Sequence, residues 1–153
     1  MTLSLNIPSP LPAGMHPGQF LQALTETQHE LSSDLEGQVN LAFVSEAQAR
    51  QLNHQYAHNN YATDVLSFDY FESSLEPAKS EDERGEVIIC LPVAERQAEE
   101  HGTSLDGELL LLFVHGVLHL HGLDHDDEQK TSFADHQNAI MDRLTESHRD
   151  IFA

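Results

Sequence analysis

Residues 115 to 125 read H-G-V-L-H-L-H-G-L-D-H, and this segment constrains the fold more than any other part of the chain. His115 and His119 are four residues apart, so on a helix both imidazoles lie on one face, about one turn apart. The run from Leu109 to Val114 is apolar throughout, which predicts that this helix is buried. Gly122 suits the left-handed conformation that closes a helix. We therefore expect a buried central helix that carries two chelating histidines and ends near Gly122.

A third histidine follows the expected turn. His125 stands six residues after His119, and it reaches the same ion only if the chain reverses at Gly122. Three imidazoles that leave one coordination position open are typical of a catalytic zinc site, where the metal lowers the pKa of a water to about 7. The spacing predicts one zinc ion (Zn2+) bound by His115, His119 and His125. Nickel, copper and iron also suit three imidazoles.

Several polar residues near these histidines either contribute to the metal site or lie outside it. His121 points about 200° around the helix from His119, so we leave it out of the ligand set. Asp124 and Asp126 either accept the second N–H of a metal-bound imidazole or are solvated carboxylates. His136, on a later helix, is interpreted as an exposed histidine, although it could approach the site.

Gly116 narrows the chemistry. The histidine spacing equals that of the metzincin peptidases, H-E-x-x-H-x-x-G-x-x-H, but Gly116 takes the position of their general-base glutamate. The chain lacks at this position the carboxylate that takes a proton from water. A metallopeptidase, or another metal-dependent hydrolase, is therefore the weaker alternative.

The length and composition predict one domain spanning residues 1–153. The sequence shows no signal peptide and no apolar run near the roughly 18 residues that a membrane span needs. We expect a soluble, cytoplasmic protein that does not bind a membrane. Cys90 is the single cysteine; we expect it in a buried strand, with no disulfide-linked partner.

The charge is strongly negative. Seven basic residues against 26 acidic ones give a formal charge of −19, and the basic residues form no cluster in the sequence. Binding to a phosphate backbone usually relies on a basic patch. An enzyme of nucleic acids would have to focus its few cations, use the metal, or be brought to its substrate by a partner. We favour the simpler interpretation that the acidity keeps the protein soluble.

The hydrophobic pattern predicts an α+β fold. Helices are expected from Pro17 to about Ser33, from Glu46 to about Tyr56 with Ser45 and Gln48 as a capping box, from Pro92 to Gly102, from Ser104 through His119, and from Glu128 to Glu146. Strands are expected at Leu3–Ile7 on an edge, Val39–Val44, Val65–Phe71 and Glu86–Leu91, with loops at Asn59–Thr63 and Glu72–Arg84. The result is a small mixed four-stranded sheet packed with about five helices, with the metal helix central and the last helix covering it.

The chain resembles the YbeY family of bacterial zinc-dependent endoribonucleases. The family motif H-G-x-L-H-L-x-G-x-D-H is matched by His115, Gly116, Leu118, His119, Leu120, Gly122, Asp124 and His125. The segment T-D-V-L-S-F stands intact at Thr63–Phe68, and the family's strand opening with glycine and an acidic residue resembles Gly85–Cys90. The resemblance covers most of the chain from Val39 onward.

This resemblance implies a fold, a metal and a pathway. His115, His119 and His125 would bind zinc in an α+β domain. The protein would be a single-strand-specific endoribonuclease acting in the 3′-end maturation of 16S ribosomal RNA and in quality control of the small ribosomal subunit. Its partners would be ribosomal RNA and that subunit. No catalytic residue is assigned.

The chain departs from the family pattern at one position. Family members carry an arginine just after the stretch L-N-x-x-Y, whereas here Tyr56 is followed by Ala57. Alanine cannot stabilise a pentacovalent phosphate as a guanidinium does. Ala57 and the lack of basic clusters motivate a further alternative, a non-catalytic ribosome-assembly factor.

Overall fold

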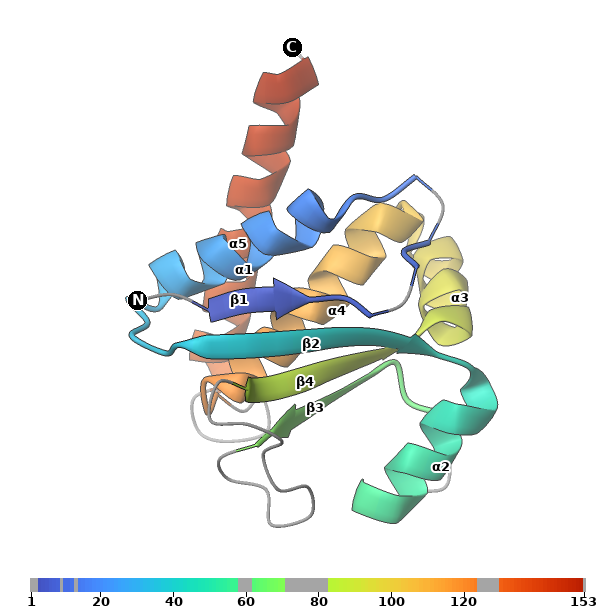
Figure 1. Cartoon of the computed structure of the whole chain (residues 1–153). Coiled ribbons are helices and arrows are strands. Elements are labelled where there is room, and N and C mark those ends of the chain that lie inside the picture. The colour runs from blue at the N-terminus through green and yellow to red at the C-terminus, as the bar shows by residue number, and fades with distance from the viewer. Residues whose placement is uncertain are drawn as a thin grey trace.

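The computed structural model describes residues 3–8, 10–12, 14–57, 62–70, 83–123 and 130–152. In chain order these residues form β1 (Leu3–Asn6), α1 (Pro17–Glu30), β2 (Gly37–Val44), α2 (Glu46–Ala57), β3 (Val65–Asp69), β4 (Glu83–Cys90), α3 (Leu91–His101), α4 (Leu105–Leu120) and α5 (Lys130–Phe152). Figure 1 shows α1, α4 and α5 together on one face of the sheet. The predicted α+β class is confirmed.

The strands form one mixed sheet in the order β1-β2-β4-β3. β1 pairs parallel with β2, and β2 pairs parallel with β4. β3 runs antiparallel to β4, with Ser67 opposite Val87. The parallel pairs need crossover connections, which α1 provides between β1 and β2. The predicted edge position of the first strand is confirmed.

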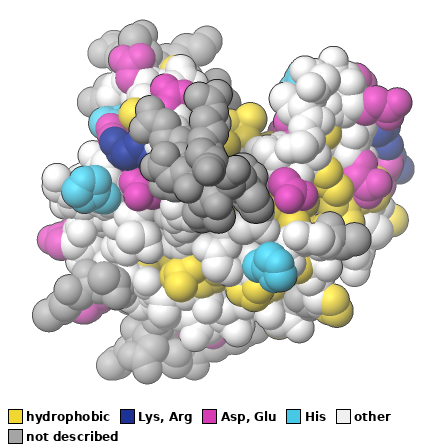
Figure 2. All heavy atoms as spheres, turned by 90° about the horizontal axis from the view of Figure 1, so that it is seen from above, with side chains coloured by type: hydrophobic (Ala, Val, Ile, Leu, Met, Phe, Trp, Pro, Cys, Tyr) yellow, Lys and Arg dark blue, Asp and Glu magenta, His cyan; other side chains and the backbone are white. Residues whose placement is uncertain are grey.

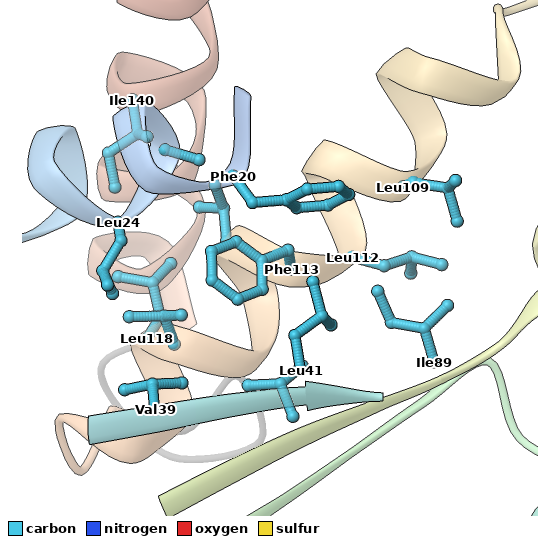
Figure 3. Packing of buried hydrophobic residues seen from close by; sticks show 14 of the residues in the cluster. Phe20, Leu24, Val39, Leu41, Ile89, Leu109, Leu112, Phe113, Leu118 and Ile140 are labelled. Atoms are coloured by element: carbon cyan, nitrogen blue, oxygen red, sulfur yellow. The ribbon is translucent and has the colours of Figure 1, made fainter. Parts of the chain in front are cut away.

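The core lies between the sheet and the helices (Figure 3). Phe20 of α1 meets Phe113 of α4 edge to face, with ring centroids 5.5 Å apart. Leu41 of β2 and Ile140 of α5 are fully buried in the same cluster. α4 contributes five of the largest fully buried side chains, Leu109, Phe113, Val114, Val117 and Leu118. The predicted metal helix is therefore the central helix of the domain.

Local capping explains several helix boundaries. At the start of α2, Gln48 N donates to Ser45 Oγ at 3.2 Å and Ser45 N donates to Gln48 Oε1 at 3.0 Å, which is the predicted capping box. At the start of α4, Gly107 N donates to Ser104 Oγ at 3.0 Å. Gly102 closes α3 with a φ of 67°.

Several predicted boundaries differ from the structure. The first strand ends at Asn6, the second begins at Gly37, and the third helix begins at Leu91, each one or two residues from its expected position. Three larger differences have a physical cause. β4 begins at Glu83, so the expected loop does not extend to Arg84. Charged residues belong to the strand here because Tyr70 N donates to Arg84 O at 3.1 Å, which extends the ladder with the chain after β3. α1 ends at Glu30, since Ser32 takes a positive φ of 48°. α5 continues to Phe152, beyond the last apolar residues of the repeat.

Two further points concern composition. Cys90 is 1% exposed, as predicted for a core strand residue, and burial raises the pKa of its thiol. No single described helix is long and apolar enough to cross a membrane; α3 and α4 pass a test of length and composition only as a pair, bent by 116°.

Candidate metal centre

The first two predicted ligands face each other on α4. His115 Nε2 and His119 Nε2 lie 3.1 Å apart, and the ring centroids are 4.7 Å apart. Both side chains are partly buried, on a helix whose neighbouring positions are mostly buried. Zinc binds imidazole nitrogen at about 2.0 to 2.1 Å, so two ligands of a tetrahedral ion lie about 3.3 Å apart. The observed separation fits one shared ion.

The third predicted ligand cannot be placed. His125, Asp124 and Asp126 lie outside the described residues. Within the described part of the chain, no cluster of three His, Cys, Asp or Glu side chains is suited to hold a metal. The structure therefore provides the His115–His119 pair, and His125 stays a prediction.

The turn that would bring His125 back is present. α4 ends at Leu120, and Gly122 has a φ of 84°. Leu123 N donates to Leu118 O at 3.2 Å, and Gly122 N donates to His119 O at 2.9 Å. These two bonds form the Schellman motif that closes a helix and redirects the chain. The prediction for Gly122 is confirmed.

Gln137 of α5 contacts the ring nitrogen of His115 that faces away from His119, a contact that the sequence did not predict. His115 Nδ1 lies 3.2 Å from Gln137 Oε1. An amide oxygen only accepts, so Nδ1 carries the proton and Nε2 keeps its lone pair toward His119. Such a contact fixes the tautomer and orientation of a ligating histidine. Asp124 and Asp126 were the predicted candidates for this role, but periodicity does not reveal a contact across 22 residues.

Phe133 of α5 closes one side of the pair. Its ring centroid is 5.0 Å from that of His115 and 5.2 Å from that of His119, and the residue is 3% exposed. The last helix thus covers the site as predicted. His136, one residue before Gln137, is only partly exposed, with 30% of its side chain accessible, and its Nδ1 lies 2.7 Å from Glu30 Oε2 of α1.

Gly116 allows α4 to approach the sheet closely. A Cβ added at this position would lie 2.7 Å from Val87 Cγ1 and 2.9 Å from Ser67 Oγ. A glutamate therefore cannot be accommodated here without moving the helix. The close packing of α4 on the sheet therefore explains why this position holds glycine and not the glutamate that serves peptidases as general base.

The T-D-V-L-S-F segment joins β3 to this helix. Ser67 Oγ donates to Gly116 O at 2.9 Å. Asp64 Oδ1 accepts from Val65 N at 2.8 Å and so fixes the start of the strand. Phe68 meets Tyr56 of α2 edge to face, with centroids 5.2 Å apart. The motif positions α4 against the sheet.

His121 is engaged elsewhere, in agreement with its exclusion from the ligand set. Its Nδ1 lies 2.9 Å from Val117 O, and its Nε2 lies 2.7 Å from Ser33 Oγ. Nδ1 therefore donates to the carbonyl, and Nε2 accepts from the hydroxyl. Burial lowers the pKa of this imidazole below its ordinary value. His121 ties the end of α4 to the connection between α1 and β2.

Three arginines are paired with carboxylates. Arg84 lies 3.5 Å from Asp69, Arg96 pairs with Glu46, and Arg143 binds Glu26 and Glu30. On the face shown in Figure 2, acidic side chains are spread widely and the dark-blue side chains do not form a broad patch. The predicted lack of basic clusters thus holds on this face among the described residues.

Ala57 is the last residue of α2. The adjacent His58, which follows the position of the family arginine, lies outside the described residues.

Comparison with known proteins identifies the relatives of the chain. The family model described as endoribonuclease YbeY matches residues 16–145. An endoribonuclease YbeY of Synechococcus sp. (strain RCC307) is 45% identical over 109 residues, covering 69% of this chain and 68% of that protein. One from Pseudomonas putida (strain F1) is 37% identical over 125 residues, covering 77% and 73%.

Coverage differs among the other similar proteins. The YbeY protein of Ralstonia nicotianae is 39% identical over 92 residues, and the chain spans 46% of its length. The solution structure of TM1509 from Thermotoga maritima superimposes with a TM-score of 0.62 at 25% identity, covering 97% of this chain and 92% of that one. A match from residue 16 to residue 145 includes α4 with both histidines and the part of α5 that carries Phe133 and Gln137. The chain therefore belongs to the endoribonuclease YbeY family.

Proposed function

We propose that this protein is a cytoplasmic, zinc-dependent endoribonuclease that cuts single-stranded ribosomal RNA. Its substrate would be the 3′ end of 16S ribosomal RNA, and its partner the small ribosomal subunit, whose quality it would help to control. The main structural support is the pair of facing nitrogen atoms, His115 Nε2 and His119 Nε2, 3.1 Å apart on the central helix. The relatives named endoribonuclease YbeY support the reaction class.

The residues present suit a zinc ion. His115 and His119 would hold it together with His125, and Gln137 would keep His115 in the tautomer with Nε2 free to bind. A zinc ion, when bound, supplies a Lewis acid for a phosphate oxygen and a means of lowering the pKa of a water molecule. Phe133 excludes solvent from one side of the two imidazoles, which strengthens electrostatic interactions there.

Ala57 predicts slow cleavage. A guanidinium at this position would stabilise negative charge developing on the phosphate, and one such donor is commonly worth about 100-fold or more in rate. The protein would therefore rely more heavily on the metal than relatives with arginine do. A protein that only assembles subunits would instead retain binding to them after the metal ligands are lost.

A cleavage assay with ligand variants tests the proposal. The purified protein is expected to bind about one zinc ion per chain and to cut a single-stranded ribosomal RNA fragment, leaving the paired form intact. His119→Ala should lose both zinc binding and cleavage. His29→Ala removes an exposed imidazole from α1 and should change neither.

Three results would overturn the nuclease. The proposed nuclease activity is wrong if the metal-loaded protein leaves the RNA intact under conditions in which a related nuclease cuts it. Zinc-dependent turnover of a peptide in place of RNA would also overturn it. Co-sedimentation with small subunits that survives His119→Ala, without cleavage by the wild type, would favour the assembly factor.

A further inference from the structure

A cavity of about 380 Å³ opens beyond the C-terminal end of α4. Its walls come from the connection between α1 and β2, from the first residues of β4 and from the turn after α4, and they include Leu31, Ser33, Leu35, Arg84, His121 and Leu123. We call it the α4-end pocket. Small-molecule sites commonly measure about 300 to 1,000 Å³, so this pocket suits one compact group. We propose that it binds one unpaired nucleobase of the RNA, an inference that rests on the proposed function.

The polar wall of the pocket is held in place before any ligand arrives. Ser33 Oγ lies 2.7 Å from His121 Nε2 and accepts from Leu35 N at 3.2 Å. His121 Nδ1 also contacts Val117 O at 2.9 Å. The serine, the imidazole and the backbone at Leu35 thus form one bonded unit that joins two segments 88 residues apart. A ligand meets a preorganised surface, which reduces the entropy cost of binding.

The apolar wall suits a flat ring. Leu31, Leu35 and Leu123 are partly buried and pack against the main core, so their exposed surfaces are supported from behind. Nucleobases present two apolar faces and a polar edge, which matches apolar walls beside fixed hydrogen-bonding groups. A hydrated ion gains little from such leucine surfaces.

The charges around the pocket disfavour a phosphate. α1 ends at Glu30 and α4 ends at Leu120, and the C-terminal end of a helix carries negative partial charge. Asp34, also on the wall, is exposed and adds a carboxylate. Arg84 is the cation of the wall, with Asp69 3.5 Å away. A neutral ring whose exocyclic amino group donates hydrogen bonds is better matched than an anion.

The backbone at Arg84 is irregular in the sheet. Gln38 pairs with Glu83 while Val39 pairs with Gly85, so Arg84 is the extra residue of a bulge. Bulges redirect a side chain and are common beside functional sites. Arg84 lines the pocket, and a guanidinium in this position can stack on a base or donate hydrogen bonds to its edge.

The pocket also continues from the metal helix. Leu120, which lines it, directly follows His119. In this proposal, a strand whose phosphate lies near His115 and His119 continues past the end of α4, where one of its bases enters the pocket. Such binding would suit a protein of charge −19, because the affinity for RNA would come from a base as well as from phosphates.

A nucleoside titration tests the ligand class without any cleavage. Full-length protein labelled with nitrogen-15 is titrated separately with adenosine, cytidine, guanosine, uridine and inorganic phosphate. The amides of Leu35, Leu120 and Leu123 are expected to shift with the three nucleosides that carry an amino group, less with uridine, and not with phosphate. Shifts caused by phosphate alone, or by none of the five probes, overturn the proposal.

Two matched variants link the pocket to RNA. Asp34→Trp places a large ring at the rim, and Glu36→Trp places the same ring on an exposed residue outside the pocket. Asp34→Trp should raise KM for a single-stranded fragment roughly tenfold, the lower range for losing one stacked base, and retain kcat. Glu36→Trp should leave both unchanged.

The outcomes separate the two proposals. If the wild type and both variants cleave RNA with equal KM, the proposal that the pocket binds a nucleobase is wrong, and the proposed endoribonuclease activity is unaffected. Shifts with nucleosides in a protein that cuts no RNA support the pocket and overturn the nuclease.

Discussion

Glu30 of α1 and His136 of α5 are joined by a contact of 2.7 Å between Oε2 and Nδ1, across 106 residues of sequence. Arg143 donates to the other oxygen of the same carboxylate at 2.7 Å and to Glu26 at 3.0 Å. The hydrogen bond from His136 and that from Arg143 lower the pKa of Glu30 below its ordinary value. These contacts fix α5, which carries Gln137 and Phe133, against α1.

The first prediction concerns the pH dependence of this link. A carboxyl whose pKa is lowered on folding stabilises the protein above its unfolded pKa, about 4.3, and loses that contribution as the pH falls through the lower folded value. Glu30→Gln should therefore reduce the free energy of unfolding at pH 7 by about 1 kcal/mol. The difference from the wild type should shrink below about pH 5.

Urea unfolding at several pH values from 7 to 3 measures the difference in the free energy of unfolding between Glu30→Gln and the wild type. Glu36→Gln removes the same charge from an exposed position, so it corrects for the general effect on an acidic protein. A destabilisation by Glu30→Gln that stays constant down to pH 3 would contradict the prediction.

The second prediction concerns Gly116. Alanine here would place its Cβ 2.7 Å from Val87 Cγ1, and overpacking of this kind costs about 1 to 3 kcal/mol. Gly18 of α1 has nothing within 4 Å of its added Cβ, so Gly18→Ala should be neutral or stabilise the helix by up to about 1 kcal/mol. Chemical denaturation compares the two variants. Equal midpoints for Gly116→Ala and the wild type would show that α4 does not need this close approach.

The third prediction concerns Gln137. Gln137→Leu removes the acceptor for His115 Nδ1 and should weaken zinc binding about 10- to 100-fold. Gln137→Glu keeps an acceptor and should retain or increase affinity. Competition with a chromophoric chelator gives the dissociation constants, and nitrogen-15 shifts of the His115 ring in the metal-free protein report its tautomer.

Asn138→Leu provides the control, because Asn138 is exposed on the same helix. If Gln137→Leu and Asn138→Leu bind zinc equally well and His115 keeps one tautomer, Gln137 does not orient the ligand.

The fourth prediction concerns salt. Arg84, Arg96 and Arg143 already pair with carboxylates, so few counterions should be released when RNA binds. Each phosphate neutralised on a single strand contributes about 0.7 to the slope of log K against log salt concentration. We expect a slope of magnitude about 1 to 2, measured by fluorescence anisotropy with cleavage blocked by metal removal. A slope near 5 would indicate a basic surface formed on binding.

The fifth prediction concerns Ala57. Ala57→Arg restores the guanidinium that the resemblance places here and should raise kcat/KM for RNA by about 100-fold or more. Gln55→Arg adds the same charge two residues earlier on an exposed part of α2. An equal gain from both variants would indicate general attraction of RNA rather than a specific contact with the phosphate.

Local chemistry made much of this fold predictable. Helix ends are set by contacts between residues only a few positions apart in the sequence. The predicted boundaries at Ser45 with Gln48, at Ser104 and at Gly122 agree with the structure. The four-residue spacing of His115 and His119 fixed their shared face for the same reason. Helix geometry alone determines both kinds of feature.

Contacts between distant segments could not be predicted in the same way. Gln137 behind His115, Ser33 on His121 and Glu30 on His136 all depend on how helices pack, and the polar residues involved carry no periodic signal. The bulge at Arg84 likewise depends on pairing with β2. The contact of His136 could not be predicted because its partner, Glu30, lies on another helix.

His115 and His119 lie on α4, whereas the residues that contact their rings, Gln137 and Phe133, lie on α5. α4 is the central helix, and its histidines are fixed by the core around Phe113 and Leu118. Gln137 and Phe133 arrive on α5, a peripheral helix attached to α1 by Glu30 and its partners. If zinc binds here as proposed, substitutions along α5 would change how His115 is oriented and how Phe133 covers the pair, while His115 and His119 would keep their positions on α4.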